Sequence, residues 1–118
     1  FKLIDFGIAT FIQGRTYTLI GTPHYMAPEV IIGRGYGVQA DYWSVGIMLY
    51  EFICGMVPFG EEEEDPIVIY ECILKRKVTF PENLFVNTEV KEFINKLLTK
   101  SPAIRIGGSI EKLLKHSW

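Results

Sequence analysis

A chain of 118 residues forms at most one domain or a part of one. Hydrophobic residues make up 48% of it and charged residues 22%, a balance that excludes an intrinsically disordered chain. The formal net charge of −2 gives no reason to expect nucleic-acid binding, and the short basic tract Lys75-Arg76-Lys77 falls at a predicted helix end, where cations suit the helix dipole.

The most apolar stretch, Tyr42 to Phe59, is about as long as a membrane span. Glu51 lies in its middle, however, and Gly55 and Pro58 break the helix before its end. A charged residue at the centre of a bilayer costs about 2.5–3.5 kcal/mol on insertion scales. We therefore expect a buried helix of a globular core and no membrane span.

Cys54 and Cys72 lie in apolar helical patterns without metal-ligand spacing. Buried free thiols are expected rather than a disulfide, which suits a reducing compartment. The first residues lack the extended apolar core of a signal peptide. These features predict a cytoplasmic protein, and the absence of an initiator Met fits a fragment of a longer chain.

The segment before Gly33 contains few regular elements. Leu3-Ile4 and Ile8-Ala9 are predicted to form two very short strands around a turn. From Thr10 to Pro28 the chain shows no sustained period, which indicates a long ordered loop of the kind that carries function. A short helical turn is predicted at Glu29–Ile32, ended by Gly33.

A strongly apolar helix is predicted from about Gln39 to Cys54. Its apolar side chains cover nearly every face, so it belongs in a core and needs neighbours on every side. Gly55 is suited to the position that ends the helix, and Pro58 prevents continuation.

The remaining helices are predicted to be amphipathic and to cover this one. Asp65 is a suitable N-cap for a helix over Ile67–Lys75, Thr88 for one over Glu89–Lys100, and Ser109 for one over Ile110–His116. The inward-facing residues expected are Ile67, Tyr70, Ile73 and Leu74 in the first, Val90, Phe93, Ile94, Leu97 and Leu98 in the second, and Ile110, Leu113 and Leu114 in the third. The fold class is mainly α.

Four motifs occur in a fixed order: Asp5-Phe6-Gly7, Ala27-Pro28-Glu29, Asp41-x-Trp43-Ser44-x-Gly46, and Arg105 after the penultimate helix. In this order they resemble the eukaryotic protein kinases, from the activation segment through the last helices of the large lobe. The resemblance implies that residues 1–118 are part of one kinase domain, the C-terminal portion of the helical large lobe of the kinase-like (α+β) fold. These residues include no glycine-rich loop, no β-strand lysine and no His-Arg-Asp catalytic loop, so we expect this segment alone to be inactive.

The sequence in and around the activation segment resembles a narrower group of kinases. Residues 14–25, His24-Tyr25-Met26-Ala27-Pro28-Glu29 and the stretch 50–60 are similar to the cyclic-nucleotide-dependent branch of the AGC group, in particular the cGMP-dependent kinases of protists. This resemblance implies regulation by a cyclic nucleotide, through domains outside these residues.

The resemblance assigns the metal site to Asp5, which matches the family's Mg²⁺ ligand for bound ATP. It implies that Phe6 packs and that Gly7 permits unusual backbone torsions. Thr22 matches the threonine that contacts the catalytic aspartate.

The resemblance also places regulation and substrate binding in the activation segment. Thr18 aligns with the phosphorylated threonine, whose phosphate would order the loop by pairing with basic groups. Leu19 and Pro23 would line the pocket for the residue after the acceptor, and an ordinary loop role is the alternative. The Gly21-Thr22-Pro23 sequence suggests Ser/Thr substrates.

Glu29 and Arg105 correspond to a buried ion pair that braces the activation segment. Asp41 matches the aspartate that accepts backbone N–H bonds from the catalytic loop, although an ordinary acid at a helix start would look the same. The spacing to Trp43 favours the specific role.

Glu51 is the most telling specificity residue, because a carboxylate on an apolar helix is costly without a partner. By resemblance it receives an arginine two residues before the phosphorylated site, with Tyr25 alongside, and a satisfied core glutamate is the alternative. His24 departs from basophilic relatives, which often carry glutamate there. The acidic run Glu61–Asp65 is most simply a solvated loop before a helix, and steering of basic substrates is the other possibility.

The function expected of the parent protein is transfer of the ATP γ-phosphoryl group to Ser/Thr of basic peptides, with Mg²⁺ as cofactor. The alternative is a kinase-derived fragment or pseudokinase that acts only as a peptide- or protein-binding module.

Overall fold

The computed structural model describes residues 2–11, 13, 15–16, 21–108, 111 and 114–115. Thr18 and Leu19, to which the sequence assigned the phosphosite and part of a substrate pocket, lie outside the described residues. The same holds for Ser109, Ile110, Leu113 and His116, so the last predicted helix is not tested as a whole.

The described part is mainly α, as predicted. Its elements are, in order, the 3₁₀ turn η1 (Pro23–Tyr25), helices α1 (Pro28–Ile31), α2 (Gln39–Cys54), α3 (Pro66–Lys75) and α4 (Thr88–Leu97), and the 3₁₀ turn η2 (Arg105–Gly108). The two short strands predicted at residues 3–4 and 8–9 are wrong, because residues 2–11 form an exposed irregular segment that pairs with no other described segment. Among the described residues, β pairing is limited to an isolated antiparallel bridge between Thr16 and Tyr36.

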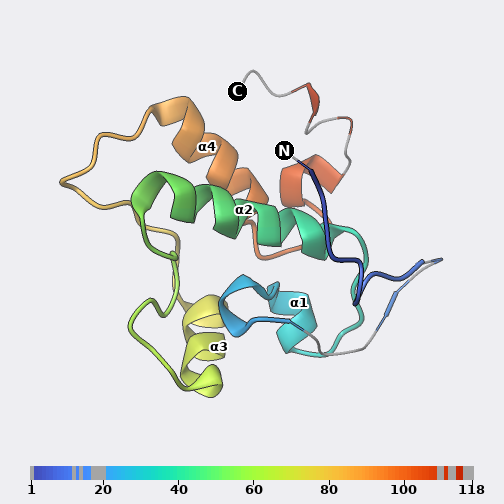
Figure 1. The fold of residues 1–118 in the computed structure, drawn as a ribbon. Helices are drawn as coiled ribbons and strands as arrows, with labels where there is room; N and C mark the ends of the chain where they lie inside the picture. Colours follow the sequence, from blue (N-terminus) through green and yellow to red (C-terminus); the bar gives the residue numbers. More distant parts are fainter. Residues whose placement is uncertain are drawn as a thin grey trace.

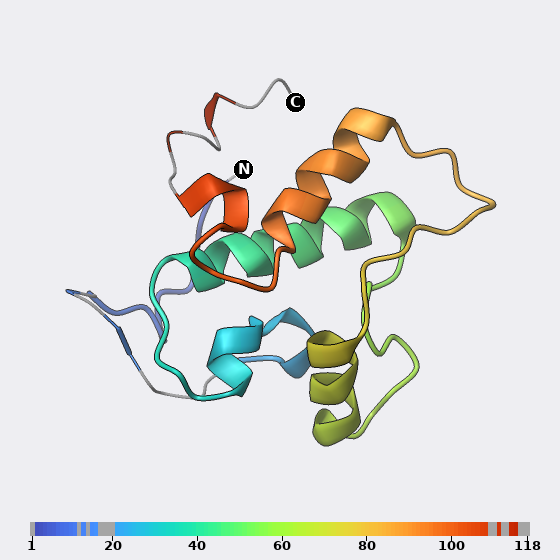
Figure 2. The same cartoon turned by 180° about the vertical axis from the view of Figure 1, so that it is seen from behind.

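Helix α2 runs through the centre of the fold. Helix α4 and turn η2 pack on one side of it, while η1, α1 and α3 lie on the other (Figures 1 and 2). The predicted bounds of α2 are confirmed at both ends. Gly55 ends it in the left-handed conformation, with φ of 74°, and its N–H donates to the Glu51 carbonyl over 2.8 Å.

The described part of the chain supplies only some of the neighbours that α2 is expected to need. Trp43, Ile47 and Tyr50 are buried between the two layers. Val45 and Met48 are exposed, and 73% of Phe52 is exposed, because no described element packs on that side of the helix.

Of the N-caps predicted for α3 and α4, the first is confirmed and the second lies one residue earlier. Asp65 Oδ1 accepts from Ile67 N–H over 2.9 Å, which confirms the predicted cap of α3. For α4 the cap is Asn87 rather than Thr88, since Asn87 Oδ1 accepts from Glu89 N–H over 2.8 Å and Thr88 is already helical. Helix α4 also ends at Leu97, three residues before the predicted Lys100.

The buried faces were predicted well for α4 and only partly for α3. Val90, Phe93, Ile94 and Leu97 of α4 are buried, as expected. In α3 the buried residues are Ile69, Cys72 and Ile73, whereas Ile67 is exposed, because the face at spacing i, i+3, i+4 that starts at Ile69 is the one that meets the core.

Two further expectations from the sequence concern the cysteines and a membrane span. Both cysteines are free, with Cys72 buried and Cys54 half-buried. None of the helices formed by the described residues is long and apolar enough to span a bilayer.

Candidate functional site

The Asp5-Phe6-Gly7 segment forms a tight turn at the surface. Asp5 has a φ of 59°, and its Oδ1 accepts a hydrogen bond from Gly7 N–H over 3.2 Å. A Cβ at residue 7 would lie 3.1 Å from that Oδ1, so a larger residue there would require the exposed Asp5 carboxylate to shift by a few tenths of an ångström. The positive φ of this turn lies at Asp5 and not at Gly7, where the unusual torsions were expected.

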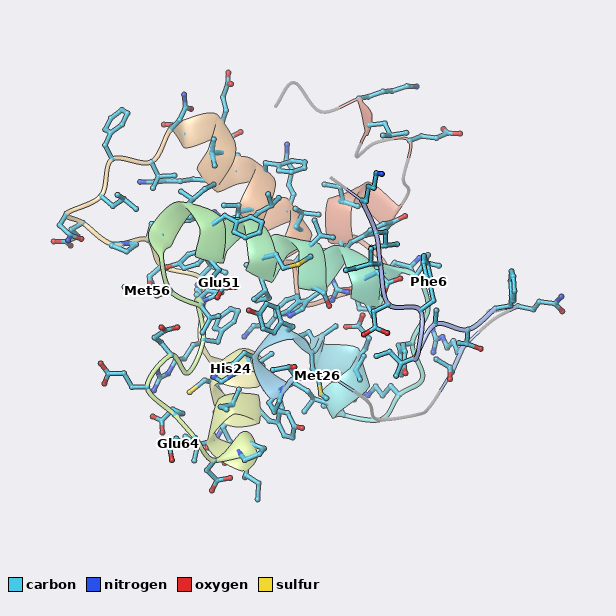
Figure 3. All side chains as sticks on the ribbon, viewed as in Figure 1. Phe6, His24, Met26, Glu51, Met56 and Glu64 are labelled. Carbon is cyan, nitrogen blue, oxygen red and sulfur yellow. The ribbon has the colours of Figure 1, made fainter. Side chains whose placement is uncertain are left out.

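Phe6 does not pack as expected. Its side chain is 64% exposed, and it belongs to neither buried apolar cluster of the described residues. The reason is local, because segment 2–11 runs along the outside of the fold (Figures 1 and 3).

Turn η1 presents Thr22, Pro23 and Tyr25 beside α2. The Thr22 carbonyl accepts from Tyr25 N–H over 3.1 Å, while the Thr22 side chain makes no capping bond and is exposed. Ser44 Oγ of α2 donates to the Tyr25 carbonyl over 2.9 Å, which fixes η1 against the central helix. On the far side of the turn, His24 Nε2 lies 3.0 Å from the Gly60 carbonyl oxygen.

Tyr25 and Glu51 form the polar centre of this surface. The Tyr25 hydroxyl donates to Glu51 Oε2 over 2.6 Å, and both side chains are half-buried. This hydrogen bond is the main cause that raises the pKa of Tyr25 to about 12, with burial and the negative charges of Glu51 and Glu61 adding to it. Figure 3 shows Glu51 on α2 and His24 in the neighbouring turn.

Glu51 is anchored by a neutral partner and not by a cation. Among the residues that the structure describes, no lysine or arginine forms an ion pair with it. Its second oxygen, Oε1, accepts no hydrogen bond from a described residue and is available to a further donor. A half-buried carboxylate in this state favours binding of a cationic group.

The acidic run after α2 is partly structural. Glu61 Oε2 accepts from Val57 N–H over 2.6 Å, and Asp65 caps α3. Glu62 and Glu64 are exposed (Glu64 is labelled in Figure 3). Because Glu61 contributes to the raised pKa of Tyr25, the run extends the negative potential around Glu51.

Glu29 and Arg105 form a bidentate ion pair in the core. Arg105 Nη1 and Nη2 lie 2.6 and 2.9 Å from the two Glu29 carboxylate oxygens, and both side chains are buried. The guanidinium also donates to three backbone carbonyls and lies 5.2 Å from the ring centroid of Trp43. Those carbonyls belong to Gln39, Thr99 and Lys100, at 2.7, 2.9 and 3.2 Å. This hub joins α1, the start of α2 and the segment that leads into η2.

Trp43 is fully buried and stacks on Phe59, with 5.9 Å between ring centroids. Asp41, two residues earlier in α2, is exposed, and partial desolvation raises the pKa of its carboxyl group. Its carboxylate makes no hydrogen bond to any described residue, so the role that the resemblance gives it stays a prediction.

The structure thus brings the predicted site residues together in two groups. Tyr25 and Glu51 meet at the η1–α2 surface beside Pro23, and Glu29, Trp43 and Arg105 meet in the core. Asp5 belongs to neither group, and the described residues contain no cluster of three or more potential metal ligands. Sequence reasoning missed the bond from Ser44 to Tyr25, because its acceptor is a backbone carbonyl that no residue pattern marks.

Comparison with known proteins identifies the family. The family model described as "Protein kinase domain" matches residues 1–118. A cGMP-dependent protein kinase of Plasmodium berghei is 54% identical over 92% of this chain, and one of Toxoplasma gondii is 51% identical over 92%. The serine/threonine-protein kinase DCLK1 of Rattus norvegicus is 40% identical over 99% of the chain.

The chain spans only 13%, 11% and 27% of the lengths of these three relatives. Its helices are consistent with the C-terminal helical lobe of the kinase fold. Because the family model covers the whole sequence, the chain belongs to the protein kinase family.

Proposed function

We propose that this chain is part of the catalytic domain of a serine/threonine kinase that phosphorylates peptides with an arginine two residues before the acceptor. Residues 1–118 would run from the activation segment through the later helices of the large lobe. The observation that carries the proposal is the Tyr25–Glu51 pair, a half-buried carboxylate held by a neutral hydroxyl with no cationic partner among the described residues.

In this proposal each polar group of the η1–α2 surface has a distinct task. Glu51 binds the guanidinium of the substrate through its carboxylate, since an arginine–carboxylate contact is charge-assisted and planar. Tyr25 fixes the orientation of that carboxylate, and Ser44 fixes Tyr25. Thr22 presents its free hydroxyl towards the catalytic aspartate, and Pro23 with Leu19 contacts the residue after the acceptor.

The cofactor would be Mg-ATP, which supplies the phosphoryl group when it is bound. Asp5 fits the metal in part: its Oδ1 accepts from Gly7 N–H, and its exposed carboxylate retains lone pairs for a ligand. Mg²⁺ in such sites is held by one or two carboxylates together with substrate phosphates, so a single aspartate here is compatible with a nucleotide-bound metal. Phosphorylation of Thr18 would order the activation segment.

Regulation by cGMP is the finer part of the proposal. It is supported by the two protist relatives, which are named cGMP-dependent protein kinases. The two free cysteines suit the reducing environment of a cytoplasmic location. Assays of the full-length protein with cGMP and with cAMP test the regulation, and equal activity with and without either nucleotide would refute it.

The docking role is tested with two peptides that differ only in arginine or glutamine two residues before the serine. In the full-length kinase, Glu51→Ala should raise KM for the arginine peptide and leave the glutamine peptide nearly unchanged. The expected loss in kcat/KM is about 10- to 150-fold, from the roughly 1.5–3 kcal/mol of a hydrogen bond to a charged group. Glu92→Gln, a change of an exposed glutamate of α4 on the other side of α2, is the matched control and should affect both peptides equally.

Equal losses of kcat/KM for both peptides in Glu51→Ala would contradict the docking role. No phosphorylation of either peptide by the full-length wild-type protein would favour the alternative of a non-catalytic binding module.

A further inference from the structure

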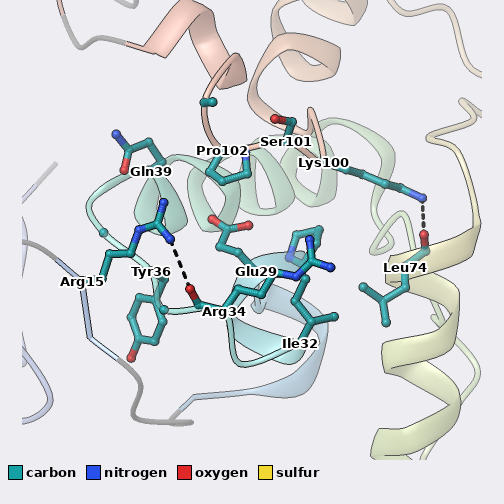
Figure 4. Close-up of a pocket in the computed structure, with 14 residues that line it drawn as sticks. Arg15, Glu29, Ile32, Arg34, Tyr36, Gln39, Leu74, Lys100, Ser101 and Pro102 are labelled. Atoms are coloured by element: carbon teal, nitrogen blue, oxygen red, sulfur yellow. Dashed lines mark hydrogen bonds between the residues drawn. The ribbon is translucent and has the colours of Figure 1, made fainter.

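A second polar surface involves neither Tyr25 nor Glu51. A cavity of about 640 Å³ lies between α1, the link from α1 to α2, the C-terminal end of α3 and residues 100–103 (Figure 4). Arg15, Arg34 and Lys100 line it together with the apolar side chains of Ile32, Leu74 and Pro102.

The cavity carries an excess of positive charge. Glu29 is the acidic residue in its lining, and both of its oxygens are bound to Arg105. None of the three cations forms an ion pair with a described carboxylate. Instead, Arg15 Nη1 donates to the Arg34 carbonyl over 3.3 Å, and Lys100 Nζ donates to the Leu74 carbonyl over 2.7 Å (Figure 4).

Lys100 sits in an unfavourable electrostatic environment. Burial lowers the pKa of its ammonium group, and the like charge of Lys77 lowers it further. A bound anion would offset this repulsion. In a chain whose net charge is −2, three unpaired cations around one cavity are a concentration of charge that the overall composition does not require.

The walls of the cavity are held by the fold and do not depend on a ligand. Thr16 and Tyr36 exchange two backbone hydrogen bonds of 2.9 and 2.8 Å, which tie the segment that carries Arg15 to the link that carries Arg34. The Glu29–Arg105 hub fixes α1 and the segment beside Lys100. The cations are therefore presented by a prearranged frame, which reduces the entropy lost on binding.

We propose that this cavity is a docking site for an acidic segment of a protein partner, with a carboxylate or phosphate group held by Arg15, Arg34 and Lys100. The apolar walls formed by Ile32, Leu74 and Pro102 would contact a neighbouring apolar side chain of that segment. An acidic peptide fits better than a nucleic acid, because three cations are few for a phosphate backbone.

The test measures fluorescence anisotropy of labelled peptides added to the full-length protein. The probes are a peptide of three glutamates flanked by leucines, the same peptide with one phosphoserine in place of the central glutamate, and a glutamine version. Saturable binding of the two anionic peptides, weakened by added salt, is expected, with little binding of the glutamine peptide. The ratio between the two anionic probes identifies whether carboxylate or phosphate is preferred.

Arg34→Gln and Lys100→Gln should each weaken binding about tenfold, because each removes one charge-assisted contact. Lys115→Gln, a change of an exposed lysine outside the cavity lining, is the matched control and should bind like the wild type. These readouts do not involve phosphoryl transfer, so the docking proposal and the kinase proposal can fail separately.

Three outcomes would overturn the proposal. The first is no saturable binding of either anionic peptide, and the second is equal binding by wild type, Arg34→Gln and Lys100→Gln. The third is displacement of the acidic peptide by single-stranded RNA at lower concentration than by unlabelled peptide, which would assign the cavity to a nucleic acid.

Discussion

Replacing Arg105 by methionine tests the structural hub most severely. Arg105 has no exposed surface, and its guanidinium makes five hydrogen bonds, two to the Glu29 carboxylate and three to backbone carbonyls. The substitution keeps a long apolar side chain against Trp43 but removes every donor. It leaves Glu29, which is also buried, with a carboxylate that has lost both of its charged contacts.

The magnitude follows from these contacts. Breaking one partner of a buried ion pair costs about 3–5 kcal/mol, mainly because the remaining charge is left without compensation. Domains of ordinary stability unfold with about 5–15 kcal/mol, so this single change removes a large share. Restoring charge balance with the double change Glu29→Met and Arg105→Met should recover part of the loss, with a coupling of about 0.5–3 kcal/mol.

Urea unfolding of the full-length protein and its variants, followed by tryptophan fluorescence, measures these values. Lys75→Met is the matched control, since it breaks the Lys75–Glu71 pair, whose side chains are 72% and 61% exposed. That pair should be worth no more than about 0.5 kcal/mol. If Arg105→Met shifts the unfolding midpoint no further than Lys75→Met, the hub does not brace the fold.

Three further predictions concern other parts of the chain. Tyr25 should ionise near pH 12 and not near pH 10. Because its pKa is raised in the folded state, the stability that its hydroxyl confers should be complete below pH 10 and lost as the pH rises towards 12. Titration of absorbance at 295 nm in wild type and Tyr25→Phe checks this, and a smaller absorbance change near pH 10 in the variant would contradict it. Gly46→Ala should destabilise the fold by about 1–3 kcal/mol, because a Cβ there would lie 2.8 Å from Leu98 Cδ2 and 2.9 Å from Leu97 Cβ. Thermal melts measure this, and a raised Tm would show that the better helix propensity of alanine outweighs the clash. Asn87→Ala should lower the free energy of unfolding by about 1 kcal/mol and Thr88→Ala by much less, since Asn87 caps α4. The reverse order in urea unfolding would show that Thr88 is the cap.

Much of the helical architecture could be predicted from local signals. The C-terminal end of α2 was predictable because glycine readily adopts the left-handed conformation that ends a helix, and the start of α3 because an aspartate precedes a proline. The buried face of α4 followed from its regular apolar spacing. These signals lie within a few residues of the element that they specify.

The failures depend either on neighbours distant in sequence or on local backbone geometry that the residue types do not determine. The inward face of α3 was misassigned because Ile67 and Ile69 are equally apolar, and only contact with the core distinguishes them. Asn87 and Thr88 are both capable caps, so the register depended on backbone geometry. Within the candidate site, Glu51 stood out as a charge on an apolar helix, whereas the cavity of Arg15, Arg34 and Lys100 draws on three separate segments that no motif unites.

The central claim is that the Tyr25–Glu51 pair selects an arginine two residues before the acceptor. The most direct test is phosphorylation by the full-length protein of a peptide library varied at each position around the serine, compared between wild type and Glu51→Gln. The wild type should prefer arginine at that upstream position, and the variant should lose this preference there while its selectivity at other positions is unchanged. An unchanged arginine preference in Glu51→Gln would contradict the claim.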